Sequence, residues 1–191
     1  MALDEGVFVH DRALCESDQI GAGTRIWAFA HVMKGAKIGA ECNVCDHAFI
    51  ESGAVLGDRV TVKNCVLVWD KVTVEDEVFL GPNMVFTNDM NPRVAFKKDA
   101  SEFLPTLVKR GASIGANATI VCGVTVGECA FVGAGTVVIR DVPAYAMIVG
   151  NPGRQVGWMC ACGEKLPESR TCAACARAYE QQPSGLALLD T

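Results

Sequence analysis

The chain has 191 residues and a formal net charge of −5; half of its residues are hydrophobic and 7% are aromatic. No basic run points to nucleic acid, no apolar run approaches the roughly 18 residues of a membrane span, and residues 1–5 do not begin a signal peptide. We therefore expect a cytoplasmic protein with neither a membrane nor a nucleic-acid partner.

A hydrophobic residue returns at every sixth position along most of the chain. The first series is Leu14, Ile20, Ile26, Val32, Ile38, Val44, Ile50, Leu56, Val62, Val68, Val74, Leu80 and Phe86. The second series is Val108, Ile114, Ile120, Val126, Val132 and Val138. A period this short predicts a parallel β-helix, in which six residues make one strand and one corner and three such units close a triangular turn. Residues 18 positions apart then stack at a spacing of about 4.8 Å.

Small residues at the fourth position after many of these hydrophobic residues let the wall of the coil close. They are Thr24, Ala30, Ala36, Ala48, Ala118 and Ala130. Segments such as Val60-Thr61-Val62 are β-branched and lack the period of a helix. We therefore expect an all-β domain over residues 1–156.

The hexapeptide pattern is interrupted between Phe86 and Val108. These two residues are 22 positions apart where six suffice, so an insertion separates the two series. A long insert with proline and aromatic anchors on a rigid scaffold is usually functional. We expect residues 87–107 to form a flap loop over an active site. An arm that packs on a neighbouring subunit is the alternative, and the two roles are compatible.

Stacking by 18 positions places polar residues together at the root of this flap. Asp70 falls beneath Asn88, and Trp69 falls beneath Thr87. A second column, one corner earlier, consists of His47, Cys65 and Asn83. A polar cluster beside a long loop is the best candidate for a functional site in this chain.

Downstream of the flap, Ala118, Thr136 and Arg154 are also spaced by 18 positions. The two small side chains predict a groove with an arginine at its far end, and Arg140 is expected close by. Because guanidinium groups bind phosphate in two-pronged geometry, this groove is a candidate site for a phosphate-bearing ligand.

The C-terminal segment is rich in cysteine. Its four cysteines are Cys160, Cys162, Cys172 and Cys175. Four thiolates from two short loops resemble a zinc ribbon, and a module this small needs a metal in place of a core. We expect residues 157–181 to bind a structural Zn²⁺ and to cap the coil, with residues 182–191 as a loose tail; a metal-free tail is the alternative. The six cysteines inside the repeat are expected to be small, buried or half-buried hydrophobes in the reduced form.

Several segments resemble the hexapeptide acyltransferases, in particular the N-acyltransferases of nucleotide-linked 3-amino sugars. The segments are Arg25-Ile26-Trp27, residues 42–51, Val68-Trp69-Asp70, Gly81-Pro82-Asn83, Phe86-Thr87-Asn88-Asp89 with Pro92-Arg93, residues 111–120, and Gly150-Asn151-Pro152-Gly153-Arg154. The resemblance implies a left-handed parallel β-helix and an N-acetyltransferase of surface polysaccharide biosynthesis. It also implies acetyl-CoA as the acyl donor, an amine on a UDP- or dTDP-linked deoxysugar as the acceptor, and a homotrimer with active sites between subunits.

Two branches of that family are compatible with the sequence. The Cys45-Asp46-His47 and Thr87-Asn88-Asp89 segments resemble the dTDP-3-amino-3,6-dideoxyhexose transferases. The cysteine-containing ending from Gly157 resembles the UDP-2-acetamido-3-amino-2,3-dideoxyglucuronate transferases. This ending and the short single-domain length favour the second branch by a small margin.

The resemblance also implies roles for individual residues. Asp70 and Asn88 are expected to accept hydrogen bonds from the sugar amine; His47 is expected nearby as a base or a sugar ligand, or else is an ordinary turn histidine. The expected substrate-binding residues are Trp69, Asn83, Asp89 and Arg93, the last directed at phosphates or a sugar carboxylate. The residues expected to contact coenzyme A are Ala118, Thr136, Arg140 and Arg154.

Two other functions on the same fold are disfavoured. Residues 87–107 contain no histidine. Acetylation of a hydroxyl needs a strong general base, whereas about a tenth of an amine with a pKa near 8 is already neutral at pH 7, so N-acetylation is favoured over sugar O-acetylation. A non-catalytic solenoid with a carbonic-anhydrase-like zinc site is disfavoured because His10, His31 and His47 are spaced by 21 and 16 positions, not 18.

Overall fold

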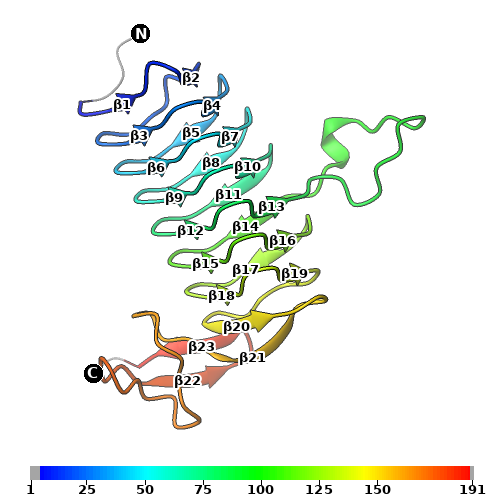
Figure 1. The fold of residues 1–191 in the computed structure, drawn as a ribbon. Helices are drawn as coiled ribbons and strands as arrows, with labels where there is room; N and C mark the ends of the chain where they lie inside the picture. Colours follow the sequence, from blue (N-terminus) through cyan, green and yellow to red (C-terminus); the bar gives the residue numbers. More distant parts are fainter. Residues whose placement is uncertain (1–4, 190–191) are drawn as a thin grey trace.

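The computed structural model describes residues 5–189, which form an almost entirely β structure (Figure 1). Three parallel sheets form the sides of a solenoid, and each turn of the chain adds one short strand to each side in succession. Neighbouring strands in one sheet come from consecutive turns, as the six-residue repeat requires. The expected hexapeptide β-solenoid is therefore confirmed.

We name the three sides sheets A, B and C. Sheet A contains β1 (Phe8–Val9), β3 (Arg25–Ile26), β6 (Asn43–Val44), β9 (Thr61–Val62), β12 (Phe79–Leu80), β15 (Ser113–Ile114), β18 (Phe131–Val132), β20 (Ala146–Val149) and the antiparallel β21 (Arg154–Trp158). Sheet B contains β2 (Leu14–Cys15), β4 (His31–Val32), β7 (Phe49–Ile50), β10 (Leu67–Val68), β13 (Val85–Phe86), β16 (Thr119–Ile120) and β19 (Val137–Val138). Sheet C contains β5 (Lys37–Ile38), β8 (Val55–Leu56), β11 (Val72–Val74), β14 (Thr106–Val108) and β17 (Thr125–Val126). A separate hairpin is formed by β22 (Tyr179–Gln182) and β23 (Gly185–Leu188).

The strand register confirms the expected length of each turn. Asn43 pairs with Thr61, one full three-unit turn further along the chain, and the same spacing recurs along most of the solenoid. Across the insertion Val72 pairs with Thr106. One regular turn plus the insertion expected from the sequence accounts for this wider spacing, so the solenoid resumes in phase after the flap.

The first turn corrects one assignment made from the sequence. Leu14 pairs with His31, and Cys15 pairs with Val32, so this turn is one position shorter than the regular turns. Cys15 therefore takes the inward-facing position that the six-residue series gave to Leu14. Leu14 points outward and is 54% exposed.

The hydrophobic core fills the inside of the solenoid. Apart from Leu14, every member of the two six-residue series is at most 3% exposed. The small residues four positions later, such as Ala48 and Ala118, are also buried. Only the corners and the outward strand residues are therefore available to bind ligands or other chains.

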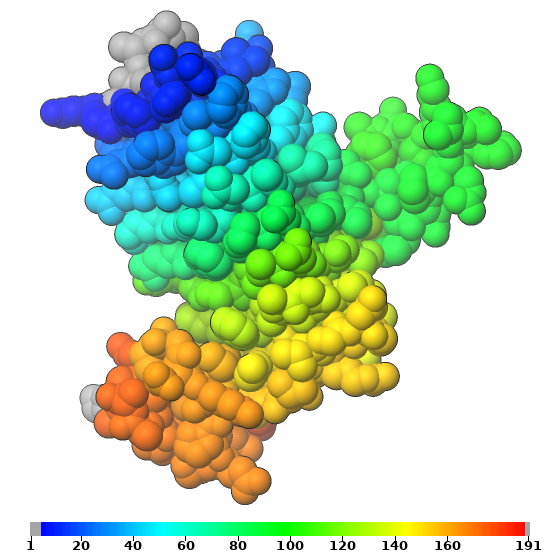
Figure 2. All heavy atoms as spheres, viewed as in Figure 1, coloured from blue at the N-terminus to red at the C-terminus, as the bar shows by residue number. Residues whose placement is uncertain are grey.

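Two segments depart from the solenoid. Residues 87–105 leave the corner between β13 and β14, include the 3₁₀ helix η1 (Ala100–Glu102), and stand clear of the solenoid wall as a lateral flap (Figure 2). The β22–β23 hairpin lies at the C-terminal end of the solenoid (Figure 1). The expected loose tail is wrong for residues 182–188, which belong to this hairpin or its turn. Residues 1–4 and 190–191 lie outside the described part of the chain, and residues 5–189 hold no helix with the length and hydropathy of a membrane span.

Candidate functional site

Asp70 and Asn88 lie at the same corner of the solenoid, between sheets B and C. Strands β10 and β13 pair one turn apart, so the residues that follow these two strands stack on the same edge. The indole Nε1 of Trp69 donates a 2.7 Å hydrogen bond to the backbone carbonyl of Phe86. Trp69 therefore lies against the start of the flap.

The half-buried carboxylate of Asp70 is held in place by the turn below it. The backbone N–H of Asp70 donates to Oε2 of Glu51 at 2.7 Å, and Oδ1 of Asp70 accepts the backbone N–H of Lys71 at 2.8 Å. Gly53, with a φ of +88°, lies directly against this carboxylate, and a Cβ there would overlap Oδ1. A larger residue at this position would therefore displace the Asp70 carboxylate. Oδ2 of Asp70 makes no hydrogen bond within residues 5–189, so it is available to a substrate.

Lys71 fastens the flap to the solenoid. Its Nζ donates to the backbone carbonyls of Ala100 and Phe103, at 2.6 and 3.0 Å. The backbone N–H of Leu104 donates to the carbonyl of Asn88 at 3.3 Å, which joins the two ends of the flap at its root. Sequence reasoning missed Lys71, because nothing in the hexapeptide pattern marks a surface lysine as the anchor of a later loop.

Asp89, which was expected to bind substrate, is engaged inside the flap. The ammonium of Lys98 hydrogen-bonds its carboxylate and lowers the pKa of that carboxyl. The backbone N–H of Asn91 donates to the same oxygen at 2.9 Å. The carboxylate is therefore committed to the internal structure of the flap.

The tip of the flap carries exposed side chains. Arg93 is exposed, and its Nη1 donates to the carbonyl of Pro92 at 3.0 Å. Val94 and Phe96 are 96% and 78% exposed. Large apolar side chains this exposed on an anchored loop are typical of a surface that contacts another molecule.

His47 and Asn83 lie on the other edge of sheet B, at the corner between sheets A and B. Both are exposed and adopt positive φ values of 60° and 57°. Cys65, one turn from each, has the same backbone conformation, with a φ of 61°, and it is exposed, so the expected burial of the repeat cysteines is wrong for Cys65. The ring of His47 stacks on Phe29 of the preceding turn, with 5.0 Å between ring centroids and 13° between planes.

Within one chain, the two groups of residues that were expected to form one site therefore lie on different edges of sheet B. Asp70 and Asn88 occupy the edge after sheet B, whereas His47 and Asn83 occupy the edge before it. The outward side chains of sheet B, which lie between these edges, are mostly apolar. They are Leu14, His31, Phe49, Leu67, Val85, Thr119 and Val137.

A pocket of about 440 Å³ lies between the end of β19 and the β20–β21 turn, and both Arg140 and Arg154 line it. The backbone N–H of Gly153 donates to the carbonyl of Val137 at 2.8 Å and holds the turn against β19. Glycine permits this approach, because a Cβ there would lie 3.0 Å from Cγ2 of Thr136. Two exposed guanidinium groups on one pocket can bind a phosphate.

The side chains of Ala118 and Thr136 do not face this pocket. Both are fully buried, because each lies four positions after an inward-facing residue, Ile114 or Val132. Arg154 lies in β21, which runs antiparallel to β20 and is not a further stacked turn of the solenoid. The expected groove along these small side chains is therefore wrong, and only the backbone at the two positions can meet a ligand.

Four cysteines of the C-terminal segment converge on one point. The Sγ atoms of Cys160, Cys162, Cys172 and Cys175 all lie within 4.8 Å of one another. The Sγ atoms of Cys160 and Cys175 are 3.5 Å apart, and those of Cys162 and Cys172 are 3.6 Å apart. A tetrahedral zinc with Zn–S bonds of about 2.3 Å separates its sulfurs by about 3.8 Å. The four thiols can therefore hold a metal ion.

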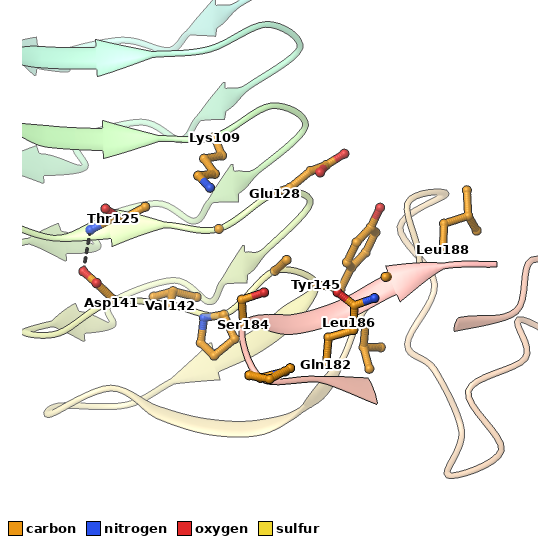
Figure 3. Close-up of a pocket in the computed structure, with 15 residues that line it drawn as sticks. Lys109, Thr125, Glu128, Asp141, Val142, Tyr145, Gln182, Ser184, Leu186 and Leu188 are labelled. Atoms are coloured by element: carbon orange, nitrogen blue, oxygen red, sulfur yellow. Dashed lines mark hydrogen bonds between the residues drawn. The ribbon is translucent and has the colours of Figure 1, made fainter. Parts of the chain in front are cut away.

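A second pocket, of about 690 Å³, lies beneath the β22–β23 hairpin (Figure 3). Ser184 from the hairpin and Lys109 from the solenoid both line it. Oδ1 of Asp141 accepts the backbone N–H of Thr125 at 2.7 Å at one side of this pocket (Figure 3). Residues 141–143 line both this pocket and the pocket of Arg140 and Arg154, which we call the arginine pocket, so the two pockets share a wall.

Known proteins resemble this chain in sequence. Residues 19–52 match the family described as bacterial transferase hexapeptide (six repeats). The chain is 50% identical to the dTDP-3-amino-3,6-dideoxy-alpha-D-galactopyranose 3-N-acetyltransferase of Aneurinibacillus thermoaerophilus over 178 residues. The matched residues make up 92% of this chain and 92% of the relative. The similarity therefore extends over nearly the whole length of both chains.

Two solved structures resemble the fold. LpxA, a UDP-N-acetylglucosamine acyltransferase from Bacteroides fragilis 9343, has a TM-score of 0.68 and 16% identity over 82% of this chain and 62% of that one. The acetyltransferase domain of PglB from Neisseria gonorrhoeae FA1090, in complex with acetyl coenzyme A, has a TM-score of 0.50 and 22% identity over 79% of this chain and 55% of that one. This chain thus matches somewhat over half of each of those proteins, and at these identities the likeness concerns the fold alone.

Proposed function

Because this chain belongs to the hexapeptide-repeat N-acetyltransferases of nucleotide-linked amino sugars, we propose that it transfers an acetyl group from acetyl-CoA to the 3-amino group of a dTDP-3-amino-3,6-dideoxyhexose. The observation that carries this proposal is the 50% identity to the Aneurinibacillus thermoaerophilus enzyme along 92% of both chains. That relative is of the dTDP type. We therefore favour the dTDP branch over the UDP-glucuronate branch that the C-terminal cysteines favoured.

The corner that carries Asp70 and Asn88 suits attack by an amine. Oδ2 of Asp70 and the side-chain carbonyl of Asn88 accept hydrogen bonds from the sugar amine and aim its lone pair at the thioester carbonyl. The nitrogen–carbon bond forms, the carbon–sulfur bond breaks, and the departing CoA thiolate takes the amine proton. Holding the two reactants in this geometry is worth about 7–11 kcal/mol, so the reaction needs no strong base.

A homotrimer would unite the two edges of sheet B. Consider three triangular coils packed around an axis parallel to their length. In each subunit one side faces the axis, and the two edges of that side contact the two neighbouring subunits. We place sheet B on the axis, because its outward side chains are mostly apolar. The edge with His47 of one subunit then meets the edge with Asp70 and Asn88 of the next. The exposed apolar tip of the flap reaches the same neighbour.

We place the phosphates of coenzyme A in the arginine pocket, and this placement can be tested. Replacing both Arg140 and Arg154 by alanine should raise the dissociation constant of CoA about 10- to 100-fold, because charge-assisted hydrogen bonds contribute about 1.5–3 kcal/mol. Isothermal titration with CoA measures the change. Arg59→Ala, which removes a guanidinium paired with Glu77 at 3.0 Å elsewhere on the solenoid, is the matched control. An unchanged dissociation constant in the double variant contradicts this placement.

The function itself is tested by release of the CoA thiol from acetyl-CoA. The acceptors are a dTDP-3-amino-3,6-dideoxyhexose, a UDP-linked 3-amino uronate and the dTDP sugar with a 3-hydroxyl. We expect release with the first acceptor, a kcat/KM at least about 100-fold lower with the other two, and an N-acetylated product by mass spectrometry. Release with the UDP sugar alone would move the chain to the other branch. Absence of release with both amino sugars contradicts the proposed function.

We place the reaction in the cytoplasm. All ten cysteines lie within residues 5–189, and none of them forms a disulfide there. Such a set of unpaired thiols is typical of proteins kept in a reducing compartment.

A further inference from the structure

The cysteine cluster has a donor set that selects its metal. Its four ligand atoms are all sulfur, which favours a soft divalent ion such as Zn²⁺ over the oxygen-seeking Mg²⁺ and Ca²⁺. The hydroxyl of Tyr179 lies 3.1 Å from Sγ of Cys160, and Nη1 of Arg177 donates to Sγ of Cys175 at 3.6 Å. The backbone N–H of Ala161 donates to the Tyr179 oxygen at 3.0 Å and orients it. Tyr179 and Arg177 thus offset the net negative charge of a Zn²⁺ complex with four thiolates.

The segment around this cluster has too small a core to hold itself together. The hydrophobic cluster around it consists of six buried side chains, Tyr145, Cys160, Leu166, Cys172, Tyr179 and Leu186, and Met159 is buried beside them. Two of the six are cysteines of the cluster, and Tyr145 belongs to the solenoid. So few apolar groups cannot offset the chain entropy of ordering the segment, and a bound metal supplies the missing free energy.

The same segment covers the last corner of the solenoid. The rings of Tyr145 and Tyr179 lie 4.9 Å apart, and the backbone N–H of Met159 donates to the carbonyl of Tyr145 at 2.8 Å. The backbone of Ala144 donates to Ser184 at 3.0 Å and accepts from Leu186 at 3.1 Å, which attaches the hairpin directly to the solenoid. Tyr179, which touches both Tyr145 and a cysteine of the cluster, connects the cluster to this attachment.

The cluster is also connected to the arginine pocket. Strand β21 runs from Arg154 to Trp158 and reaches Cys160 two residues later. Residues 141–143, beneath the hairpin, form the wall that the two pockets share. We propose that Cys160, Cys162, Cys172 and Cys175 bind one Zn²⁺, which fastens the β22–β23 hairpin over the end of the solenoid and fixes the strand that carries Arg154.

Metal analysis of the full chain tests the zinc site. Protein purified under reducing conditions should contain about one zinc ion per chain, and cobalt-substituted protein should show the visible absorption of tetrahedral thiolate-bound cobalt. Cys172→Ser should lower the metal affinity at least about tenfold. Cys15→Ser, which removes a thiol of the first turn, should leave it unchanged. Wild-type protein that binds neither zinc nor cobalt overturns the site.

Chelation of the wild-type protein tests the fastening without any substitution. Removing zinc should speed amide hydrogen exchange in residues 159–189 by about tenfold or more, leave exchange in residues 20–135 unchanged, and be reversed by added zinc. Unchanged exchange in the metal-free protein overturns the structural role of the metal.

The link to Arg154 rests on the proposed function and has its own readout. Metal-free protein should bind CoA about tenfold more weakly than zinc-loaded protein, and added zinc should restore the affinity. An unchanged CoA affinity in protein with a loosened hairpin overturns this link alone. If zinc-loaded protein does not bind CoA at all, the proposed function is contradicted. The metal site is then still supported by the metal analysis and the hydrogen-exchange measurements.

Discussion

A chain that carries both Asp70→Asn and Asn88→Ala should lose about 100- to 1,000-fold in kcat for N-acetylation, with little change in KM for acetyl-CoA. The two side chains share the edge at the root of the flap, and the Asp70 carboxylate is already fixed by Glu51, Lys71 and the close approach of Gly53. The substitutions remove the groups that orient the amine, so they affect positioning and leave CoA binding intact. Steady-state thiol-release kinetics with the dTDP-linked acceptor measure both constants.

The control for this variant changes an aspartate that has no part in the site. Asp18 is exposed and lies in the first turn of the solenoid, so Asp18→Asn should keep kcat within about twofold of wild type. Sedimentation should show that the double variant keeps the oligomeric state of the wild-type protein. A double variant with kcat within about threefold of wild type and with that state intact contradicts the catalytic assignment.

The six-residue period predicted most of the fold because it acts on every turn in the same way. Each inward residue is repeated in the turn above and below, so a single rule places almost every buried side chain of the solenoid. The rule failed at Leu14, where Leu14 and Cys15 are both hydrophobic and either one can face inward. The shorter first turn, which the period does not reveal, selects Cys15.

The same rule correctly grouped the residues at one edge of the candidate site, but it wrongly predicted a groove downstream of the flap. It states which residues share a corner, and so it brought Asp70 and Asn88 together. Ala118 and Thr136 each occupy the fourth position after an inward-facing residue and are fully buried. Small side chains at that position close the wall of the solenoid, so they do not line a groove. Lys71 contacts the flap, which is not part of the repeating turns, so the six-residue pattern gives no indication of these contacts.

The C-terminal hairpin shows why a tail without a period is hard to predict. Residues 182–188 carry no repeated pattern, and they are ordered by backbone hydrogen bonds to Ala144, which lies far earlier in the chain. By contrast, the cysteine pairs on either side of residues 163–171 were recognisable, because metal ligation requires close spacing within each pair. Local chemistry is therefore readable from the sequence, whereas its attachment to the solenoid is not.

Two inactive variants should restore activity when they are mixed. If the edge with His47 of one subunit meets the edge with Asp70 of the next, His47→Ala and Asp70→Asn chains assembled together at equal amounts should form about a quarter of the possible sites with both residues intact. Each variant alone should show little activity, so the mixture should regain about a quarter of the wild-type kcat per chain. Co-expression with two affinity tags, followed by thiol-release assays, measures the recovery.

The matched control distinguishes this arrangement from a site formed within one chain. Asp70→Asn mixed with Asn88→Ala should restore nothing, because both residues belong to the same edge of the same subunit and neither chain carries the intact pair. A site formed within one chain would leave the first mixture as inactive as its components. Recovery in the control mixture would instead mean that Asp70 and Asn88 act from different subunits. A fully active His47→Ala chain would mean that His47 is not part of the site. Only recovery confined to the first mixture fits an active site built from the two edges of sheet B in neighbouring subunits.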